Sequence, residues 1–366
     1  MNEQQINQMF LNTDWGPLQS LLTDPEVTEI MVNGYEHIYI EKRGKLIEVQ
    51  DSFRDEAHLL EIIQRISEPM GRELNESYPI LDLRLPDGSR VHVVGRPIAL
   101  AGPSMTIRKF SRRPMATGDL IGFGAWSEDM VTLIEACVKA HLNILIVGGT
   151  ASGKTTVQNI VAGMVSNEER IVTVEHSAEL VLRQKHVVAL ESRPPNVKGQ
   201  GEISFKQLVE SAVKMRPDRI IVGEVLGGEV APLMVAMNGG FDGTLFNMHA
   251  TSTRDALARL EIMMTEGNPS LPILGVREHI AAAIDVILCQ QRLRDGNRRM
   301  LSITEVTGIE GGIIKMQDIF EFVQTGVEGG KITGHFDATG VVPRFNERLQ
   351  NMGITLQDDF FTPKQR

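Results

Sequence analysis

The chain has 366 residues, of which 42% are hydrophobic and 23% are charged, the balance of a globular protein with two or three domains. A formal net charge of −10 argues against a broad nucleic-acid-binding surface, which needs a basic stripe, so no direct nucleic-acid partner is expected. The N-terminal residues lack a signal-peptide pattern, and no run of about 18 apolar residues could span a bilayer. Together these features predict a soluble protein of a reducing compartment. Cys137 and Cys289 lie far apart in apolar stretches, without zinc-ligand spacing, and are expected to be buried thiols.

Residues 1–110 are expected to form a mixed α/β domain. Residues 27–49 alternate apolar and polar side chains between turn signals, the pattern of a small antiparallel meander. Residues 56–71 carry leucines and isoleucines at helical spacing and end at Gly71, which predicts a helix. Short strands are predicted on both sides of the turn at residues 86–88.

Residues 111–124 are rich in Gly, Pro and Arg and are interpreted as a linker to a second domain, residues 125–366. In that domain Ser127 is expected to cap an amphipathic helix. Apolar β-rich runs then alternate with helical stretches, which predicts a doubly wound, mostly parallel sheet with its ligand at the strands' carboxyl ends. These runs are residues 144–147, 170–174, 219–223 and 244–249. From residue 290 a hairpin turning at Asp295-Gly296 and a C-terminal appendage are expected.

The stretch GGTASGKTT follows the first of these runs and precedes a predicted helix, the context that the phosphate-loop motif G-x-x-x-x-G-K-[ST] requires. Backbone N–H groups and the start of the helix favour bound phosphate oxygens at such a loop. Lys154 would bridge the β- and γ-phosphates of ATP, and Thr155 would ligate Mg²⁺. The predicted nucleotide-binding residues are Gly148, Gly149, Thr150, Ala151, Ser152, Gly153, Lys154, Thr155 and Thr156.

Acidic residues follow two other strand runs. Glu224 ends the third run, where a carboxylate can reach the metal or position water. Glu175 ends the second run and Glu179 lies four residues later, where a carboxylate can deprotonate an attacking water. His249 ends the fourth run. Since the carboxyl ends of parallel strands share one edge of a sheet, these groups are expected to converge there.

Several stretches resemble the secretion ATPases of the type II/IV superfamily. They are VTEIMVNGYEHIYIEKRGKL and SMTIRKF near the N-terminus, VGGTASGKTT as the phosphate loop, IVTVEHSAEL at the acidic box, MRPDRIIVGEV at Walker B and DGTLFNMHATSTRDALARLE at the histidine box. The tail ATGVVPRFNERLQNMGITL is similar to the CpaF-like ATPases of Tad (Flp) pilus assembly in particular.

This resemblance implies a RecA-like ATPase domain, a smaller PAS-like N-terminal domain and a homohexameric ring. It implies that Glu179 activates water, that Glu224 is the Walker B glutamate at the metal, and that His249 senses the γ-phosphate or links subunits. Arg90 and Arg108 match arginines that reach the phosphates. It also implies a cytoplasmic motor that hydrolyses ATP with Mg²⁺ and works on the inner face of the membrane through a platform protein, moving pilin outward or back.

Three positions depart from the family pattern. His176 stands where the acidic box usually has Asp, Leu226 where an Arg usually follows Walker B, and Phe241 where the histidine box usually has His. The residues Lys154 and Glu179 remain, which favours a working enzyme. The alternatives are a slow or non-hydrolysing, nucleotide-gated ring subunit and a conjugation-type traffic ATPase. A GTPase or small-molecule kinase fits poorly, since no Asn-Lys-x-Asp stretch is present.

Overall fold

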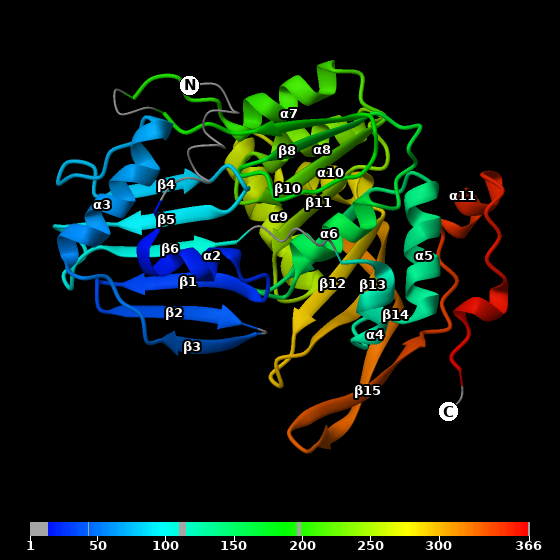
Figure 1. Ribbon diagram of the computed structural model, residues 1–366. Coiled ribbons are helices and arrows are strands. Elements are labelled where there is room, and N and C mark those ends of the chain that lie inside the picture. Colours follow the sequence, from blue (N-terminus) through cyan, green and yellow to red (C-terminus); the bar gives the residue numbers. More distant parts are fainter. Residues whose placement is uncertain (1–13, 43, 110–114, 196–198, 365–366) are drawn as a thin grey trace. The chain divides into compact units, whose positions relative to one another are not determined.

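The computed structural model describes residues 14–42, 44–109, 115–195 and 199–364 (Figure 1). The chain divides into two compact units, Met1–Arg113 and Pro114–Arg366. The described part of the expected linker contains a short helix, α4 (Thr117–Gly122). The Asp119 carboxylate accepts the Ala116 N–H at the start of this helix, and Leu120 is buried in the core of the second unit. Residues 111–114 of that linker lie outside the described residues.

The first unit is a six-stranded antiparallel sheet in the order β3-β2-β1-β6-β5-β4. Its strands are β1 (Val27–Asn33), β2 (His37–Lys42), β3 (Lys45–Val49), β4 (Ile80–Arg84), β5 (Arg90–Val94) and β6 (Ser104–Arg108), and its helices are α2 (Gln19–Thr23) and α3 (Glu56–Ser67). The predicted meander, helix and turn are all present. Buried leucine and isoleucine side chains of α3 pack with the inward side chains of the strands in one core.

The second unit is built on a nine-stranded sheet, in which six strands are parallel in the order β12-β7-β11-β10-β8-β9. These strands are β7 (Ile144–Gly148), β8 (Ile171–Glu175), β9 (Val187–Glu191), β10 (Arg219–Val225), β11 (Leu245–His249) and β12 (Val286–Arg292). The predicted mixed α/β fold with a large, mostly parallel sheet is confirmed.

Helices cover both faces of this sheet (Figure 1). One core contains α5 (Glu128–Lys139) and α6 (Lys154–Ala162), and the other contains α7 (Phe205–Lys214), α8 (Val230–Asn238), α9 (Thr253–Gly267) and α10 (Ile273–Ala283). The Ser127 hydroxyl accepts the Met130 N–H at the start of α5, as predicted. Because apolar side chains from both faces of β7 enter a core, every residue of that strand is buried.

The region after residue 285 extends the same sheet. β12 pairs in parallel with β7, and β13 (Arg298–Glu310), β14 (Ile313–Glu328) and β15 (Lys331–Ala338) follow in antiparallel order. The helix α11 (Asn346–Asn351) comes after them. The hairpin expected at Asp295-Gly296 is therefore present, but it is part of the central sheet, because the buried side chains of β12 pack in both cores.

The predicted buried thiols are confirmed. Cys137 lies in α5 and Cys289 in β12, and burial raises the pKa of both thiols, that of Cys289 to about 11. Neither thiol is therefore ionised near neutral pH, which fits a packing role.

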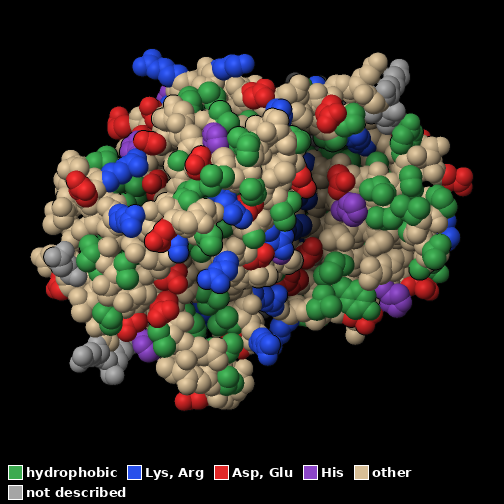
Figure 2. Space-filling view, turned by 180° about the vertical axis from the view of Figure 1, so that it is seen from behind, with side chains coloured by type: hydrophobic (Ala, Val, Ile, Leu, Met, Phe, Trp, Pro, Cys, Tyr) green, Lys and Arg blue, Asp and Glu red, His purple; other side chains and the backbone are tan. Residues whose placement is uncertain are grey.

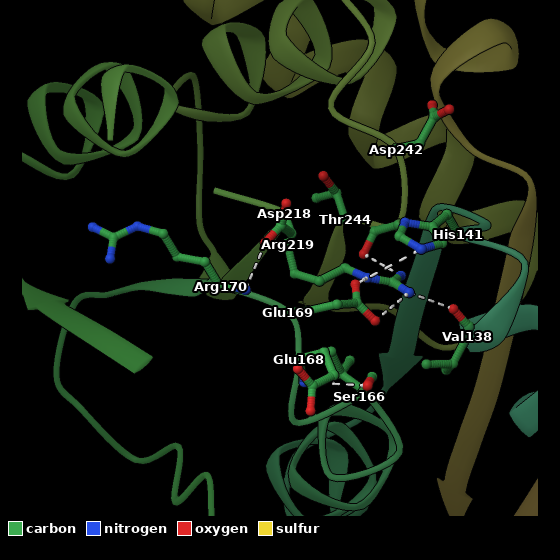
Figure 3. A network of polar contacts seen from close by, with 12 residues as sticks. Val138, His141, Ser166, Glu168, Glu169, Arg170, Asp218, Arg219, Asp242 and Thr244 are labelled. Atoms are coloured by element: carbon green, nitrogen blue, oxygen red, sulfur yellow. Dashed lines mark hydrogen bonds and ion pairs between the residues drawn. The ribbon is translucent and has the colours of Figure 1, made fainter. Parts of the chain in front are cut away.

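A buried arginine joins the amino-terminal ends of the parallel strands to α5 (Figure 3). Arg219, 1% exposed at the start of β10, donates from Nε to Glu169 Oε2 at 2.5 Å and from Nη2 to the Val138 carbonyl oxygen at 2.6 Å. His141 lies beside this pair, 3.8 Å from Glu169, and burial and the nearby Arg219 charge lower its pKa. Because a buried guanidinium needs such partners, the network holds this edge of the sheet in one arrangement.

Candidate active site

The phosphate loop lies between β7 and α6. Gly153, at φ +92°, precedes the first residue of α6, Lys154. Gly148 has no room for a side chain, because a Cβ atom there would lie 2.3 Å from both the Gln290 carbonyl oxygen and the Ser152 hydroxyl. The loop is therefore held close against the sheet, with the start of a helix at its end, which is the geometry of an anion site.

The side chains of Lys154 and Glu224 meet over this loop. Lys154 Nζ lies 3.3 Å from Glu224 Oε1, and it donates to the Gly149 carbonyl oxygen, also at 3.3 Å. Lys154 is largely buried, whereas the side chain of Glu224 is 41% exposed. A cation and a carboxylate thus lie together at the mouth of the loop, where a metal-bound phosphate needs one of each.

The ends of four parallel strands meet at this edge of the sheet. The strands β7, β11, β10 and β8 are neighbours, and His249 is the register partner of Gly148. Glu224 is the penultimate residue of β10, and Glu175 ends β8. The residues that the sequence singled out at four strand ends therefore belong to one edge.

Glu175 and Glu179 have different environments. Glu175 is 3% exposed, and its Oε2 accepts the backbone N–H groups of Glu179 at 2.6 Å and Leu180 at 3.0 Å. This carboxylate therefore fixes the loop that follows β8. Glu179 is half-buried on that loop. The geometry gives Glu175 a structural task, while Glu179 is partly accessible to solvent on the loop that Glu175 holds.

Buried amides tie α6 to the neighbouring strands. Gln158 Nε2 donates to the Val222 carbonyl oxygen of β10, and Asn247 Nδ2 of β11 donates to Gln158 Oε1, both at 2.6 Å. Gln158 and Asn247 are 0% and 2% exposed. Since buried amides must be hydrogen-bonded, this chain fixes the register of α6 against the strands that end at Glu224 and His249.

Two of the three departures from the family pattern, His176 and Leu226, contact the carboxylate of Glu229. The His176 ring stacks on Phe205 with centroids 4.2 Å apart, and its Nε2 lies 3.7 Å from Glu229 Oε1. The same Oε1 accepts the Leu226 N–H at 2.5 Å and the Gly227 N–H at 3.0 Å. Burial alone would raise the pKa of the Glu229 carboxyl. The contact with His176 and the hydrogen bonds from the backbone outweigh burial and lower that pKa to about 2. The acidic-box loop and the loop after Walker B are thereby joined.

The third departure, Phe241, is partly buried against the core on the side of α7 to α10. Its carbonyl oxygen accepts the Thr244 hydroxyl at 2.9 Å, just before β11. Both contacts give this residue a packing role at the start of the strand that ends at His249.

Sequence reasoning missed two residues of the β12–β13 hairpin that hold the phosphate loop. Gln291 Oε1 accepts the Gly149 N–H at 3.0 Å, while its Nε2 donates to the carbonyl oxygen of Ala250, the residue after His249, at 3.1 Å. Arg298 Nε donates to the Ala151 carbonyl oxygen at 2.9 Å. Neither residue belongs to a local motif, and only the pairing of β12 with β7 brings them to the loop.

In the first unit, Arg90 and Arg108 are register partners on β5 and β6. Arg84 on β4 is the partner of Arg90, so three arginines form one row across three strands, and Glu29 on β1 extends the row beside Arg108. The two predicted arginines are therefore neighbours, and a third arginine that the sequence did not single out lies beside them.

The residues of the second unit fit a magnesium nucleotide. The hydroxyl of Ser152, 1% exposed in the loop, has no hydrogen-bond partner among the residues that the structure describes, and Gly148 lets the loop backbone lie close against Gln290. Thr155 and Glu224 supply the oxygen donors that Mg²⁺ prefers, and within the described residues no group of three or more His, Cys, Asp or Glu side chains could hold an ion. Mg²⁺ bound mainly through phosphates needs no such group.

On the face that Figure 2 shows, Lys and Arg side chains are interspersed with Asp and Glu side chains. Among the described residues, no helix has the length and hydropathy needed to cross a bilayer.

Residues 12–324 match the family described as type II/IV secretion system protein. A Mycobacterium tuberculosis protein provisionally named for conjugal transfer is 34% identical over 307 residues, which cover 82% of this chain and 87% of that protein. The conjugal transfer protein TrbB of Rhizobium radiobacter is 30% identical over 293 residues, 79% of this chain and 86% of that one. The ATPase DotB of Legionella pneumophila shares the fold, with a TM-score of 0.57 at 18% identity over 84% of this chain and 81% of its own.

We expect Glu229→Gln to lower the free energy of unfolding at pH 7 by about 1–3 kcal/mol, because the negative charge of a half-buried carboxylate that accepts two backbone N–H groups and faces His176 is lost. The folded pKa of about 2 lies below the ordinary value of 4.5. The stabilisation is therefore complete above about pH 5 and is lost as pH falls toward 2, so the deficit of the variant should shrink over that window. Denaturant unfolding at a series of pH values measures it.

Glu210→Gln, an exposed change on α7, is the matched control and should cost less than about 0.5 kcal/mol at every pH. A deficit of Glu229→Gln that stays constant from pH 7 to pH 2 would contradict the assignment.

Proposed function

Because the chain belongs to the family of type II/IV secretion system proteins, we propose that it is an ATP-hydrolysing motor of a secretion or pilus machine. One observation carries the proposal. A phosphate loop, a lysine and carboxylate 3.3 Å apart, and an acid-bearing loop all lie at one edge of a parallel sheet. This set can bind a triphosphate and activate water.

Residues 148–156 would bind the phosphates of ATP, through backbone N–H groups and the Lys154 ammonium. Thr155 and Glu224 would hold Mg²⁺, which when bound offsets charge on the β- and γ-phosphate oxygens. Glu224, which is paired with Lys154 in the structure, would be the carboxylate available to that metal, directly or through water. His249 lies at the end of the neighbouring strand, where it can sense the γ-phosphate.

Glu179 is the proposed general base. Its carboxylate accepts a proton as the water oxygen attacks the γ-phosphorus and the bond to the β–γ bridging oxygen breaks, which releases ADP and phosphate. The loop that carries Glu179 is fixed by Glu175, so the base can be held at a constant place during the reaction.

Arg90 and Arg108 are proposed to stabilise the charge that develops on the transferred phosphoryl group. An arginine brought from a separate unit acts only when that unit approaches, so hydrolysis becomes coupled to domain motion. We further propose a homohexameric ring with the PAS-like N-terminal domain, a cytoplasmic protein held at the inner face of the membrane by a platform protein.

For the machine itself, the tail at residues 338–356 supports a CpaF-like ATPase of Tad pilus assembly. The second candidate is a conjugation-type traffic ATPase, which the names of the Mycobacterium tuberculosis and Rhizobium radiobacter relatives favour. A fold neighbour, the pilus retraction motor PilT with bound ADP, has a TM-score of 0.56 at 16% identity over 92% of this chain and 85% of its own.

Glu179→Gln is expected to reduce steady-state phosphate release by at least about 100-fold, since the amide cannot accept the proton, while nucleotide affinity stays within about threefold. A multiple-turnover phosphate assay and a titration with a fluorescent ATP analogue measure the two quantities. Glu168→Gln, an exposed change on the loop before β8 at the opposite edge of the sheet, is the control. Normal turnover by Glu179→Gln would rule out this base, and a parent that binds ATP without releasing phosphate would favour the nucleotide-gated alternative.

Arg90→Gln and Arg108→Gln should each lower kcat by about 100-fold or more with a smaller change in ATP affinity, because the arginines act on transition-state charge. Arg54→Gln, on the exposed loop before α3 and away from the row, should leave kcat unchanged. Equal kcat for all three variants would rule out a role of Arg90 and Arg108 in the hydrolytic step.

Deletion of the gene distinguishes a Tad pilus ATPase from a conjugation ATPase. Loss of surface pili with unchanged DNA transfer is expected for the Tad assignment, and complementation with Lys154→Ala should fail because the phosphate site is lost. Electron microscopy of the cells and mating frequencies measure the two outcomes. Loss of DNA transfer with intact pili would favour the conjugation ATPase.

A further inference from the structure

Asn159 lies one helical turn after Thr155 on α6 and faces the loop that carries Glu179. Its Oδ1 accepts the Val181 N–H at 2.7 Å. Its Nδ2 donates to the Glu179 carbonyl oxygen at 3.3 Å and to the Thr155 carbonyl oxygen at 3.1 Å. The Asn159 amide therefore connects α6 to the backbone on the carboxyl side of Glu179.

The amino side of Glu179 is held by another element. The Glu175 carboxylate at the end of β8 accepts the N–H groups of Glu179 and Leu180. The peptide groups around Glu179 are thus fixed from the sheet on one side and from α6 on the other. Because α6 begins at Lys154, the helix that presents the phosphate-binding groups also sets the place of the loop.

We propose that Asn159 is a positioning residue for the hydrolytic step, an inference that rests on the proposed function. It holds the backbone of Glu179 at a constant distance from Lys154 and Thr155, so that the carboxylate and the γ-phosphate share one rigid frame. Displacement of a reacting group by about 1 Å can cost about 100-fold in rate.

The alternative is that Asn159 only satisfies its own helix. Its bond to Thr155 is of that local kind, reaching back four residues. The bond from Val181 is different, because it joins residues 22 positions apart and is the shortest of the three. An asparagine that served the helix alone would not need the acidic loop.

The surroundings of Asn159 make it suitable for substitution. It lines an open groove of about 590 Å³ between α5, α6 and residues 181–184. A side chain that borders such a groove can be replaced without leaving a sealed cavity, so the variants are expected to fold. Asn167 lines the same groove from an exposed position and offers the matched control.

The test compares Asn159→Leu, which keeps the size and loses all three hydrogen bonds, with Asn159→Asp, which keeps the acceptor for Val181. Asn159→Leu is expected to lower kcat by about 10- to 100-fold, with ADP affinity within about twofold. Asn159→Asp should recover part of kcat, and Asn167→Leu should match the parent. In hydrogen exchange, the amides of residues 179–181 should exchange at least about tenfold faster in Asn159→Leu alone.

An unchanged kcat in Asn159→Leu would overturn the inference, as would a loss of ADP affinity in proportion to kcat, which indicates a merely structural role. The exchange measurement does not depend on turnover. If the parent releases no phosphate, the proposed function fails, and unchanged exchange at Val181 in Asn159→Leu would separately refute the anchoring of the loop. If the parent releases no phosphate but the amides exchange faster in Asn159→Leu, the anchoring of the loop by Asn159 stands, and only its role in hydrolysis fails with the proposed function.

Discussion

The candidate site depends on one constraint, the parallel alignment of β7, β11, β10 and β8 as neighbours in one sheet. Parallel pairing puts all four carboxyl ends at the same edge, so groups separated by many residues in the sequence become neighbours. The buried Arg219 network secures the opposite edge, where it joins the end of α5 to the start of β10. The buried Arg219 network and the candidate site therefore lie at opposite edges of the sheet.

The helix α6 connects the parts of the candidate site. Its first residues continue the phosphate loop, and two consecutive amides one turn later reach in different directions. Gln158 binds β10 and, through Asn247, β11, while Asn159 binds the acidic-box loop. Any shift of the phosphate loop that moves α6 must therefore move or strain all three connections. Such coupling suits a protein whose proposed task is to convert the state of a nucleotide into motion.

The unusual residues around the site form a consistent set. His176 and Glu229 form an ion pair when the histidine is protonated, and Glu229 also caps the loop at Leu226 and Gly227. The position that lacks the usual arginine is thus held through its backbone N–H, which any residue except proline can provide. In this chain, Glu229 therefore connects the loop that carries His176 with the loop that carries Leu226.

The sequence alone determined the phosphate loop, the strand runs that surround it, the antiparallel first domain and the cap at Ser127, because each depends on local periodicity or on contiguous residues. It also named Glu175 and Glu179 as candidate acids, but only the tertiary structure showed that Glu175 is buried and accepts the N–H groups of the loop that carries Glu179. Gln291, Arg298 and Asn159 became visible only in the tertiary structure. Their partners lie far away in the sequence, and a hydrogen bond between distant segments leaves no periodic signal in either of them.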